Sequence, residues 1–273
     1  MKTQVILLSV ILVLMGVERA AQGDDRGRNQ PSANAPQVDA AKSANAAQPR
    51  LVKLSKTHDV WVDPQRKLVI VNGEVAITDG PLEMFACPKG TKEHESLVAV
   101  NSTAQLVHTG LLVVGAVPGH PVQFVPEYQA ASGTVIDIWV LWQDEDGKHR
   151  VRAQHLVKNI DTEKAMEYDW VFGGSGFFTD ETSGKKYYHA DAGDMICLSN
   201  FSSAMLDLPI ESSQSNDALL FTAFTERCPP RGTKVRLVLA PRLKKQDEAE
   251  AKAAGDRESS EVGVVKEEED KQQ

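Results

Sequence analysis

The chain is poor in cysteine and in aromatic residues, and it contains no long basic run. Its 273 residues include 3 cysteines, and aromatic residues make up 6% of the chain. Three thiols are too few for a disulfide-rich scaffold or for the clustered cysteines of an iron–sulfur module. The formal net charge is −8, from 30 Lys+Arg and 38 Asp+Glu. This acidic balance does not favour binding to nucleic acid or to anionic lipid.

Nucleotide-binding loops and standard hydrolase motifs are also absent. The sequence contains neither Gly-x-x-x-x-Gly-Lys nor Gly-x-Gly-x-x-Gly. His94 is followed by Glu95, but Val98 stands where the His-Glu-x-x-His zinc motif needs its second histidine. Ser175 lies among glycines, yet Phe177 occupies the last position of Gly-x-Ser-x-Gly. No single motif therefore predicts a reaction.

The only long apolar run stands at the N-terminus. Lys2 precedes the run Val5–Val17, which is too short to span a bilayer comfortably, and Ala21–Gly23 offers small residues for cleavage. Residues 1–23 are therefore predicted to be a secretory signal peptide, with an uncleaved anchor as the alternative. We expect a periplasmic or secreted protein with no membrane insertion after signal removal.

Two segments flank the part of the chain that can fold. Residues 24–50 are rich in Ala, Asn, Gln, Ser and Pro, and residues 242–273 are rich in Lys, Glu, Asp, Ala and Gln. Neither segment can bury enough apolar surface to offset the entropy of ordering, so both are predicted to be disordered. Residues 51–241 are predicted to form the folded domain.

One helix is predicted over about residues 102–116. Ser102 and Gln105 match a capping box, and Gly115 matches a helix end. The helix is apolar nearly all round, which predicts that it is buried. Gln105, His108 and Thr109 form one polar stripe on its first turns.

The remainder of the domain favours short strands. Asp144–Gly147 joins two strand-like runs as a hairpin turn. Asn72-Gly73 predicts either a tight hairpin or a bulge in one long strand. About ten short strands are expected from the segments 60–62, 68–71, 74–77, 97–100, 122–125, 134–142, 149–155, 168–172, 187–190, 195–198 and 235–239, of which 68–71 and 74–77 are one strand if Asn72-Gly73 is a bulge. The predicted fold class is α+β, strand-dominated and mostly antiparallel, with one main buried helix.

A candidate polar site follows from the neighbourhood of the helix. A strand over residues 97–100 leads almost directly into the helix, so the residues before the strand should lie near the polar stripe. A buried polar stripe needs partners. We expect His94, Glu95 and His108 to lie close together at the mouth of the most concave part of the fold. The candidate residues are His94, Glu95, Ser96, Gln105 and His108.

Two further hypotheses concern metal and cysteine. A divalent transition metal would find ligands of suitable types in Cys87, His94, His108 and His120, although their spacing matches no standard motif. Separate histidines with structural hydrogen bonds are the alternative. Export implies an oxidising compartment, where Cys87 and Cys197 could pair. Buried unpaired thiols that behave as small apolar groups are the alternative.

Several short motifs resemble one known family. They are Gly80–Phe85 (GPLEMF), Lys92–Leu97 (KEHESL), His108–Gly115, Ser199–Phe201 (SNF) and Leu206–Ile210 (LDLPI). Together they resemble the YdjY-type domain of bacterial, often exported, proteins. The resemblance spans about residues 60–240 and implies no established activity. It is compatible with a non-enzymatic binding or structural module of the bacterial envelope, whose partner would be an envelope ligand or protein. The alternative is a metal-dependent or redox enzyme built on Cys87, His94 and His108.

Overall fold

A computed structural model describes residues 51–212 and 219–243. The predicted signal peptide (1–23), the predicted linker (24–50) and residues 244–273 of the predicted tail lie outside the described residues. Within the described part of the chain, no helix is both long enough and apolar enough to cross a membrane.

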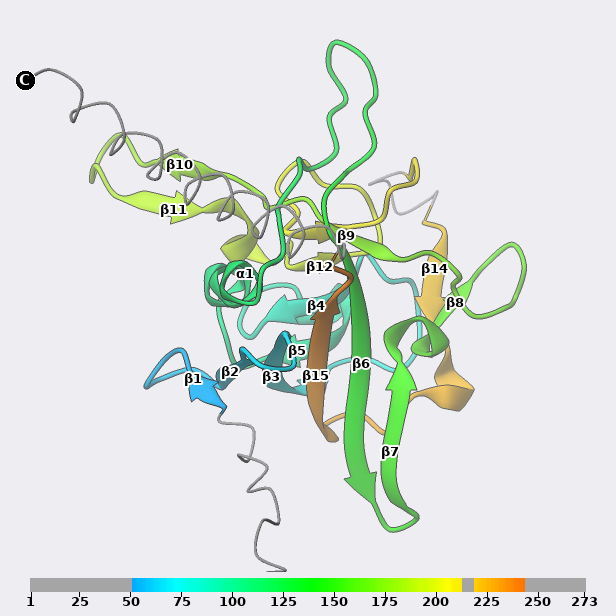
Figure 1. Cartoon of the computed structure of the whole chain (residues 1–273). Coiled ribbons are helices and arrows are strands. Elements are labelled where there is room, and N and C mark those ends of the chain that lie inside the picture. Colours follow the sequence, from blue (N-terminus) through cyan, green and yellow to red (C-terminus); the bar gives the residue numbers. More distant parts are fainter. Residues whose placement is uncertain (1–50, 213–218, 244–273) are drawn as a thin grey trace, which may run out of the picture. The chain divides into compact units, whose positions relative to one another are not determined.

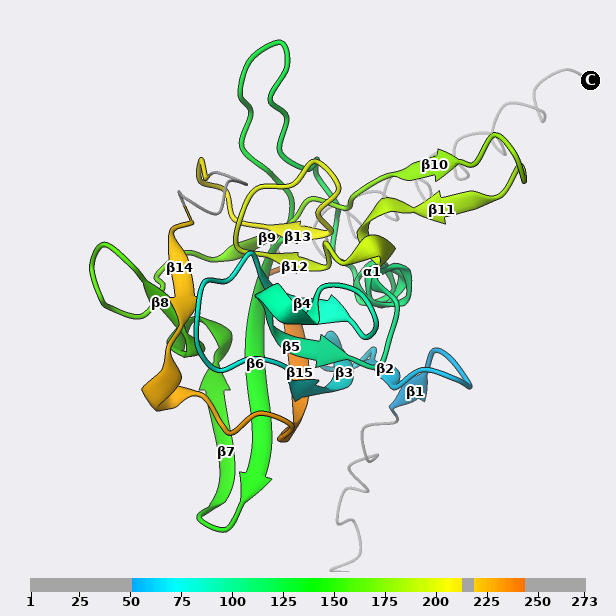
Figure 2. The same ribbon diagram turned by 180° about the vertical axis from the view of Figure 1, so that it is seen from behind.

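The main sheet closes on itself. Eight of its 11 strands form a ring in the order β3, β15, β6, β9, β13, β12, β4, β5, and β5 pairs back with β3 (Figures 1 and 2). The ring strands are β3 (Leu68–Val75), β4 (Met84–Pro88), β5 (Ser96–Val100), β6 (Val135–Asp144), β9 (Trp170–Phe172), β12 (Ile196–Cys197), β13 (Leu206–Asp207) and β15 (Lys234–Pro241). Outside the ring, β2 (Val60–Asp63) pairs with β3, β1 (Val52–Lys53) pairs with β2, and β7 (Gly147–Arg152) pairs with β6.

The predicted fold class is confirmed in its main features. Strands dominate, and all pairings in the ring are antiparallel except β12 with β13 and β4 with β5. The one α-helix among the described residues is α1 (Ala104–Val113). The closure of the sheet into a ring was not predicted.

The Asn72-Gly73 pair lies inside a continuous strand. β3 runs through it without a turn, so the hairpin alternative is wrong. At Gly73, a Cβ atom would stand 2.5 Å from the Ala99 carbonyl oxygen of β5. The glycine is needed because β3 and β5 approach each other closely at this point, where the ring closes.

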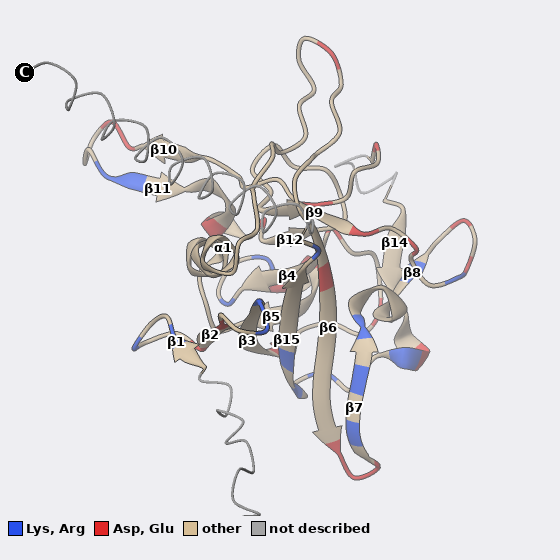
Figure 3. Cartoon of the chain, viewed as in Figure 1, with Lys and Arg blue, Asp and Glu red and all other residues tan. Residues whose placement is uncertain are grey.

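Buried and exposed residues alternate along the strands, so the sheet has an inner and an outer face. Along β15, Val235, Leu237 and Leu239 are buried, while Lys234 and Arg236 are exposed. Figure 3 shows the resulting basic bands at the start of β15 and along β7. Successive strand residues point to opposite faces, so the same strands build the core and a charged outer surface.

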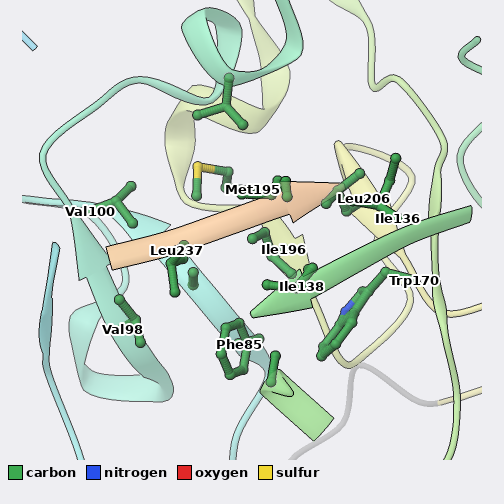
Figure 4. Close-up of a cluster of buried hydrophobic side chains, with 14 of the residues drawn as sticks. Phe85, Val98, Val100, Ile136, Ile138, Trp170, Met195, Ile196, Leu206 and Leu237 are labelled. Atoms are coloured by element: carbon green, nitrogen blue, oxygen red, sulfur yellow. The ribbon is translucent and has the colours of Figure 1, made fainter. Parts of the chain in front are cut away.

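The core fills the ring. Labelled side chains in Figure 4 come from most of the ring strands, and all of them are buried: Phe85, Val98, Val100, Ile136, Ile138, Trp170, Met195, Ile196, Leu206 and Leu237. Trp170 packs against Phe85 with ring centroids 5.4 Å apart. Its indole Nε1 donates to the Cys197 carbonyl at 2.8 Å. A buried Trp thus keeps its one donor satisfied.

Helix α1 covers one side of the ring, against β2 and β3 (Figure 1). Its N-cap is Thr103, whose Oγ1 accepts from the Leu106 amide at 3.2 Å. The predicted cap at Ser102 is therefore wrong by one residue. The prediction of a buried helix holds for one face only: Val107 and Leu111 are buried, while Leu112 and Val113 are 46% and 51% exposed.

Smaller elements surround the ring. A hairpin of β10 (Phe177–Thr179) and β11 (Lys186–Tyr188) extends away from it (Figure 1), and β8 (Val157–Asn159) pairs with β14 (Phe221–Ala223). Four short 3-10 helices complete the description: η1 (Glu93–Glu95), η2 (Ala153–Leu156), η3 (His189–Ala192) and η5 (Thr225–Arg227). Residues 122–125, predicted as a strand, are not in one.

Candidate functional site

His94 and Glu95 lie at the surface end of the predicted site. They belong to η1 rather than to an extended strand, and His94 is 76% exposed. Its Nε2 lies 3.7 Å from Glu95 Oε2. Glu95 turns its other oxygen towards Lys92 Nζ at 3.5 Å. The sequence therefore identified one side of a larger cluster.

Lys92 is the centre of that cluster. Its Nζ lies 3.1 Å from Asp194 Oδ1 and 4.5 Å from the centre of the Phe201 ring. Asp194 accepts a hydrogen bond from Ser203 Oγ at its other oxygen, Oδ2. Burial lowers the pKa of Lys92, but the carboxylates of Asp194 and Glu95 outweigh it and raise the pKa overall. We call Lys92, Glu95, Asp194 and Ser203 the Lys92 cluster.

Two further carboxyl groups are buried nearby. Burial, followed by the charge of Glu95, raises the pKa of Glu83. Burial also raises the pKa of Asp207 to about 7. Asp207 Oδ1 accepts from the Leu208 amide at 2.8 Å, while Oδ2 has no hydrogen-bond partner among the described residues. A carboxyl group without a charged partner in the interior favours its neutral form.

His108 has different partners from those predicted. Its Nδ1 lies 2.8 Å from the Tyr188 hydroxyl, which donates to the Gly174 carbonyl at 3.0 Å. Because the hydroxyl proton is used there, Nδ1 must carry its own proton and donate. The imidazole also meets the Phe172 ring edge-on at 4.8 Å. Burial lowers the pKa of His108, so the ring is held neutral between two aromatic side chains.

Gln105 does not join His108. Its side chain is exposed, and its backbone amide donates to Asp191 Oδ1 at 2.9 Å. Asp191 belongs to η3, which thereby anchors the first turn of α1. A carboxylate is favourable at a helix N-terminus, where amide donors are unpaired. The predicted polar stripe is thus divided between solvent, η3 and Tyr188.

The four predicted metal ligands are not brought together. Cys87 is buried beside the Ser96 hydroxyl, and burial raises its pKa. His120 turns its Nδ1 to the Pro121 carbonyl at 2.9 Å, and His94 and His108 lie as described above. Among the described residues, no three His, Cys, Asp or Glu side chains are arranged to hold a metal ion.

The predicted bridge between Cys87 and Cys197 is not formed in the structure. Both thiols are free and buried, and Cys228 is free as well. The pairing of β4 with β12 sets Cys197 opposite Met84, and Ile196 opposite Ala86. Cys87 therefore has no cysteine opposite it in the register. Burial raises the pKa of both Cys87 and Cys197, which keeps these thiols protonated and weakly nucleophilic.

The motifs behind the YdjY resemblance converge around Lys92. Glu83 comes from the first motif, Lys92 and Glu95 from the second, Phe201 from the fourth and Asp207 from the fifth. Backbone bonds join these segments: the Leu198 and Ser199 amides donate to the Glu83 carbonyl. The residues of these motifs thus form a polar core of the domain, and they do not line its open hollow along β3, β15, β6 and β7.

That open hollow lies elsewhere, along β3, β15, β6 and β7. Its volume is about 580 Å³, and we call it the basic pocket. Its lining comes from these four strands and from the ends of neighbouring connections: Asp59, Asn72, Gly73, Lys89, Asn101, Leu141, Trp142, Gln143, Lys148, His149, Lys234, Val235 and Arg236. In Figure 1 this region lies at the opposite end of the ring from the β10–β11 hairpin.

An aromatic stack forms one wall of the basic pocket. Trp142 and His149 face each other across β6 and β7, with ring centroids 4.7 Å apart and planes 9° apart. Asp144 fixes both rings: it accepts from Trp142 Nε1 at 3.1 Å and contacts His149 Nε2 at 2.7 Å. The hydrogen bond from His149 lowers the pKa of Asp144. The predicted Asp144–Gly147 hairpin turn therefore also orders the pocket wall.

The pocket was missed because its cations are scattered along the chain. Lys89, Lys148, Lys234 and Arg236 come from separate segments, so no basic run marks them. The sequence did carry one signal: basic residues stand two positions apart, at Lys148 and Arg150 on one strand and at Lys234 and Arg236 on another. It becomes a cluster only when β7, β6 and β15 are placed side by side.

Comparison with known proteins gives one match. The profile described as YdjY domain matches residues 60–240. No curated protein and no solved structure matches the chain. The match covers the ring of strands, the Lys92 cluster and most of the basic pocket, and by it the chain belongs to the YdjY domain family.

Proposed function

We propose that the protein is an exported, non-enzymatic binding module whose ligand site is the basic pocket. The observation that supports this function is the pocket itself. Its volume of about 580 Å³ falls in the range of small-molecule sites. Its aromatic wall is fixed by Asp144, so the site is formed before any ligand arrives.

The polar residues outside the pocket favour binding over catalysis. A nucleophile needs a base within hydrogen-bond reach or a lowered pKa. Burial raises the pKa of Cys87, Cys197 and Cys228. His108, the most enclosed histidine of the predicted site, is held by Tyr188. The redox or metal-dependent alternative would need Cys87, His94 and His108 to face one another, and each has other neighbours.

The test is ligand binding observed at the pocket by NMR. The purified protein is titrated with a panel of small carboxylates, phosphates, sugars and neutral aromatic amides. We expect the Trp142 indole signal to shift, because its ring lines the pocket. The Trp61 indole signal is the internal control, because Trp61 lies on β2 beside Lys53 and outside the pocket lining. Signals are assigned with the Trp142→Phe and Trp61→Phe variants.

Two results would contradict the proposal. If no compound of the panel shifts the NMR signals of the Trp142 indole and the pocket amides, the pocket is not a site for these ligands. If mass spectrometry shows that the protein converts a bound compound into a product, the protein is an enzyme instead. Elemental analysis of the same sample tests the metal-dependent alternative, which requires a transition metal in stoichiometric amount.

A further inference from the structure

Cations alternate along two strands that border the basic pocket. Residues i and i+2 of a strand share a face, so Lys234 and Arg236 point to the same side of β15. Arg236 lies opposite Leu141 of β6, which in turn lies opposite Arg150 of β7. Lys148 shares the face of Arg150. Basic residues from distant parts of an acidic chain are therefore placed on one face of the sheet, and Figure 3 shows the blue segments at the start of β15 and along β7.

Acidic partners account for only part of this charge. Lys89 and Lys234 both contact Glu74, the former at 3.0 Å. Within the described residues, Lys148 and Arg236 form no ion pair. The one carboxylate in the lining, Asp59, accepts from Asn101 Nδ2 at 2.7 Å and lies 3.5 Å from Lys53. The pocket therefore keeps an excess of positive charge.

Arg236 is the best oriented of these cations. Its Nε donates to Asn72 Oδ1 at 3.2 Å, which fixes the plane of the guanidinium group. Its terminal nitrogens, Nη1 and Nη2, have no partner in the described part of the chain. Such a fork matches the two oxygens of a carboxylate or phosphate group. Leu141, directly opposite Arg236 on β6, adds apolar surface beside it.

We propose that the basic pocket binds a small organic anion and that Arg236 holds its carboxylate or phosphate group, with Lys148 as the second cation. The apolar part of the ligand lies against Leu141, which shares their face. This inference rests on the proposed function, because it names the ligand class of the same pocket.

The experiment compares four probes on the purified full chain by calorimetry: phenyl phosphate, benzoate, inorganic phosphate and neutral benzamide. We expect phenyl phosphate or benzoate to bind, benzamide to bind at least tenfold more weakly, and affinity to fall as salt screens the charges. Arg236→Gln should weaken anion binding by about tenfold or more, the effect of losing a charge-assisted contact. The matched control Lys186→Gln removes the same charge from exposed β11 and should leave binding unchanged.

The possible outcomes separately test the ligand class, the role of Arg236 and the pocket as a ligand site. If benzamide binds as well as benzoate, the pocket is a ligand site and the anion inference is wrong. If Arg236→Gln, folded by circular dichroism, binds as well as the unsubstituted protein, Arg236 does not hold the anion. If no probe binds and none shifts the Trp142 indole signal, the inference and the proposed function fall together. Phenyl phosphate and benzoate separate phosphate from carboxylate recognition, and inorganic phosphate measures the contribution of the apolar part.

Discussion

Two ionisable residues of the polar core, the partly buried Lys92 and the buried Asp207, have opposite environments. Lys92 is surrounded by carboxylates and stays charged, while Asp207 forms no ion pair among the described residues and accepts hydrogen bonds from the Leu208 amide and the Asn200 amide group. A buried charge is tolerated when it is paired, and otherwise the group takes up or releases a proton. Asp207 therefore makes the stability of the fold depend on pH.

We predict that stability falls between about pH 4 and pH 7 because of Asp207. The pKa of Asp207 is raised from 3.8 to about 7 in the folded state. In this window the folded chain holds a proton that the unfolded chain has lost, so raising the pH favours unfolding. Asp207→Asn should remove this slope and be more stable at neutral pH, by on the order of a few kcal/mol. Urea unfolding of both proteins at several pH values measures the free energy of unfolding as a function of pH.

The control for this experiment is Asp161→Asn, which changes an exposed carboxyl group in the same way. It should leave the pH dependence of the urea midpoint as it is. An unchanged slope in Asp207→Asn would show that another group causes the pH dependence.

Local sequence reasoning found some of the polar residues but not their partners. Each of Glu95 and His108 has a polar partner, Lys92 Nζ for Glu95 and the Tyr188 hydroxyl for His108. Their partners, however, come from far along the chain: Tyr188 is 80 residues from His108. Short-range argument paired His108 with His94 and Glu95, because only the fold reveals which distant segment packs on a helix face.

At the scale of elements, α1 shows how a cap is selected. Ser102 and Thr103 are adjacent and both can cap, but the helix begins after Thr103, and the Ser102 hydroxyl instead donates to the Thr103 carbonyl at 3.1 Å. Ser102 is buried, so its side chain is turned inward. A capping motif therefore locates a helix start to within about a turn.

Thr103→Ala should destabilise the protein by about 1 kcal/mol, since it removes the acceptor of the Leu106 amide. Ser102→Ala, the matched neighbour, should cost less at the helix terminus. Chemical denaturation of both variants compares them. A larger loss in Ser102→Ala, with faster amide exchange at Gln105 and Leu106, would assign the cap to Ser102.

Turn motifs predicted strand connections correctly only where no other strand packs against the motif. The Asp144–Gly147 turn forms between β6 and β7, as predicted, in open surroundings. The Asn72-Gly73 pair carries a similar signal but lies in β3, where Gly73 serves the close approach of β5. Asp-Gly and Asn-Gly give similar turn signals, but the first forms a turn and the second lies where the ring closes, and only the packing decides between these outcomes.

At the scale of the whole molecule, the end of the described chain is tied back to its middle. Arg242, which the sequence assigns to the tail, lies 2.6 Å from Asp137 and 2.7 Å from Asp169 through its two terminal nitrogens. Arg152 contacts the same two carboxylates. The hydrogen bond from Arg242 is the main cause of the lowered pKa of Asp137.

A chain ending at Leu243 should be as stable as the full chain, while one ending at Pro241 should lose about 1 kcal/mol, the value of a half-exposed ion-pair network. The difference should shrink as the pH falls below 3.8, the ordinary pKa of Asp137, because the carboxylate then gains a proton. Thermal unfolding of the three chains measures both effects. Arg242→Gln in the full chain separates the loss of the guanidinium group from the effect of the new C-terminal carboxylate. An unchanged unfolding midpoint in that variant would show that Arg242 does not stabilise the fold.

The pairing of β15 also sets when this protein can fold. Lys234 of β15 contacts Glu74 of β3, 160 residues earlier, and the same strand supplies the partner of β6. A chain still emerging from the ribosome lacks this strand until residues 234–241 have been made, so until then the ring stays open and its core unformed. Contacts so distant in sequence form slowly. On the export that we propose, late closure leaves time for a translocation channel, which threads unfolded chains, to accept the protein before it becomes compact.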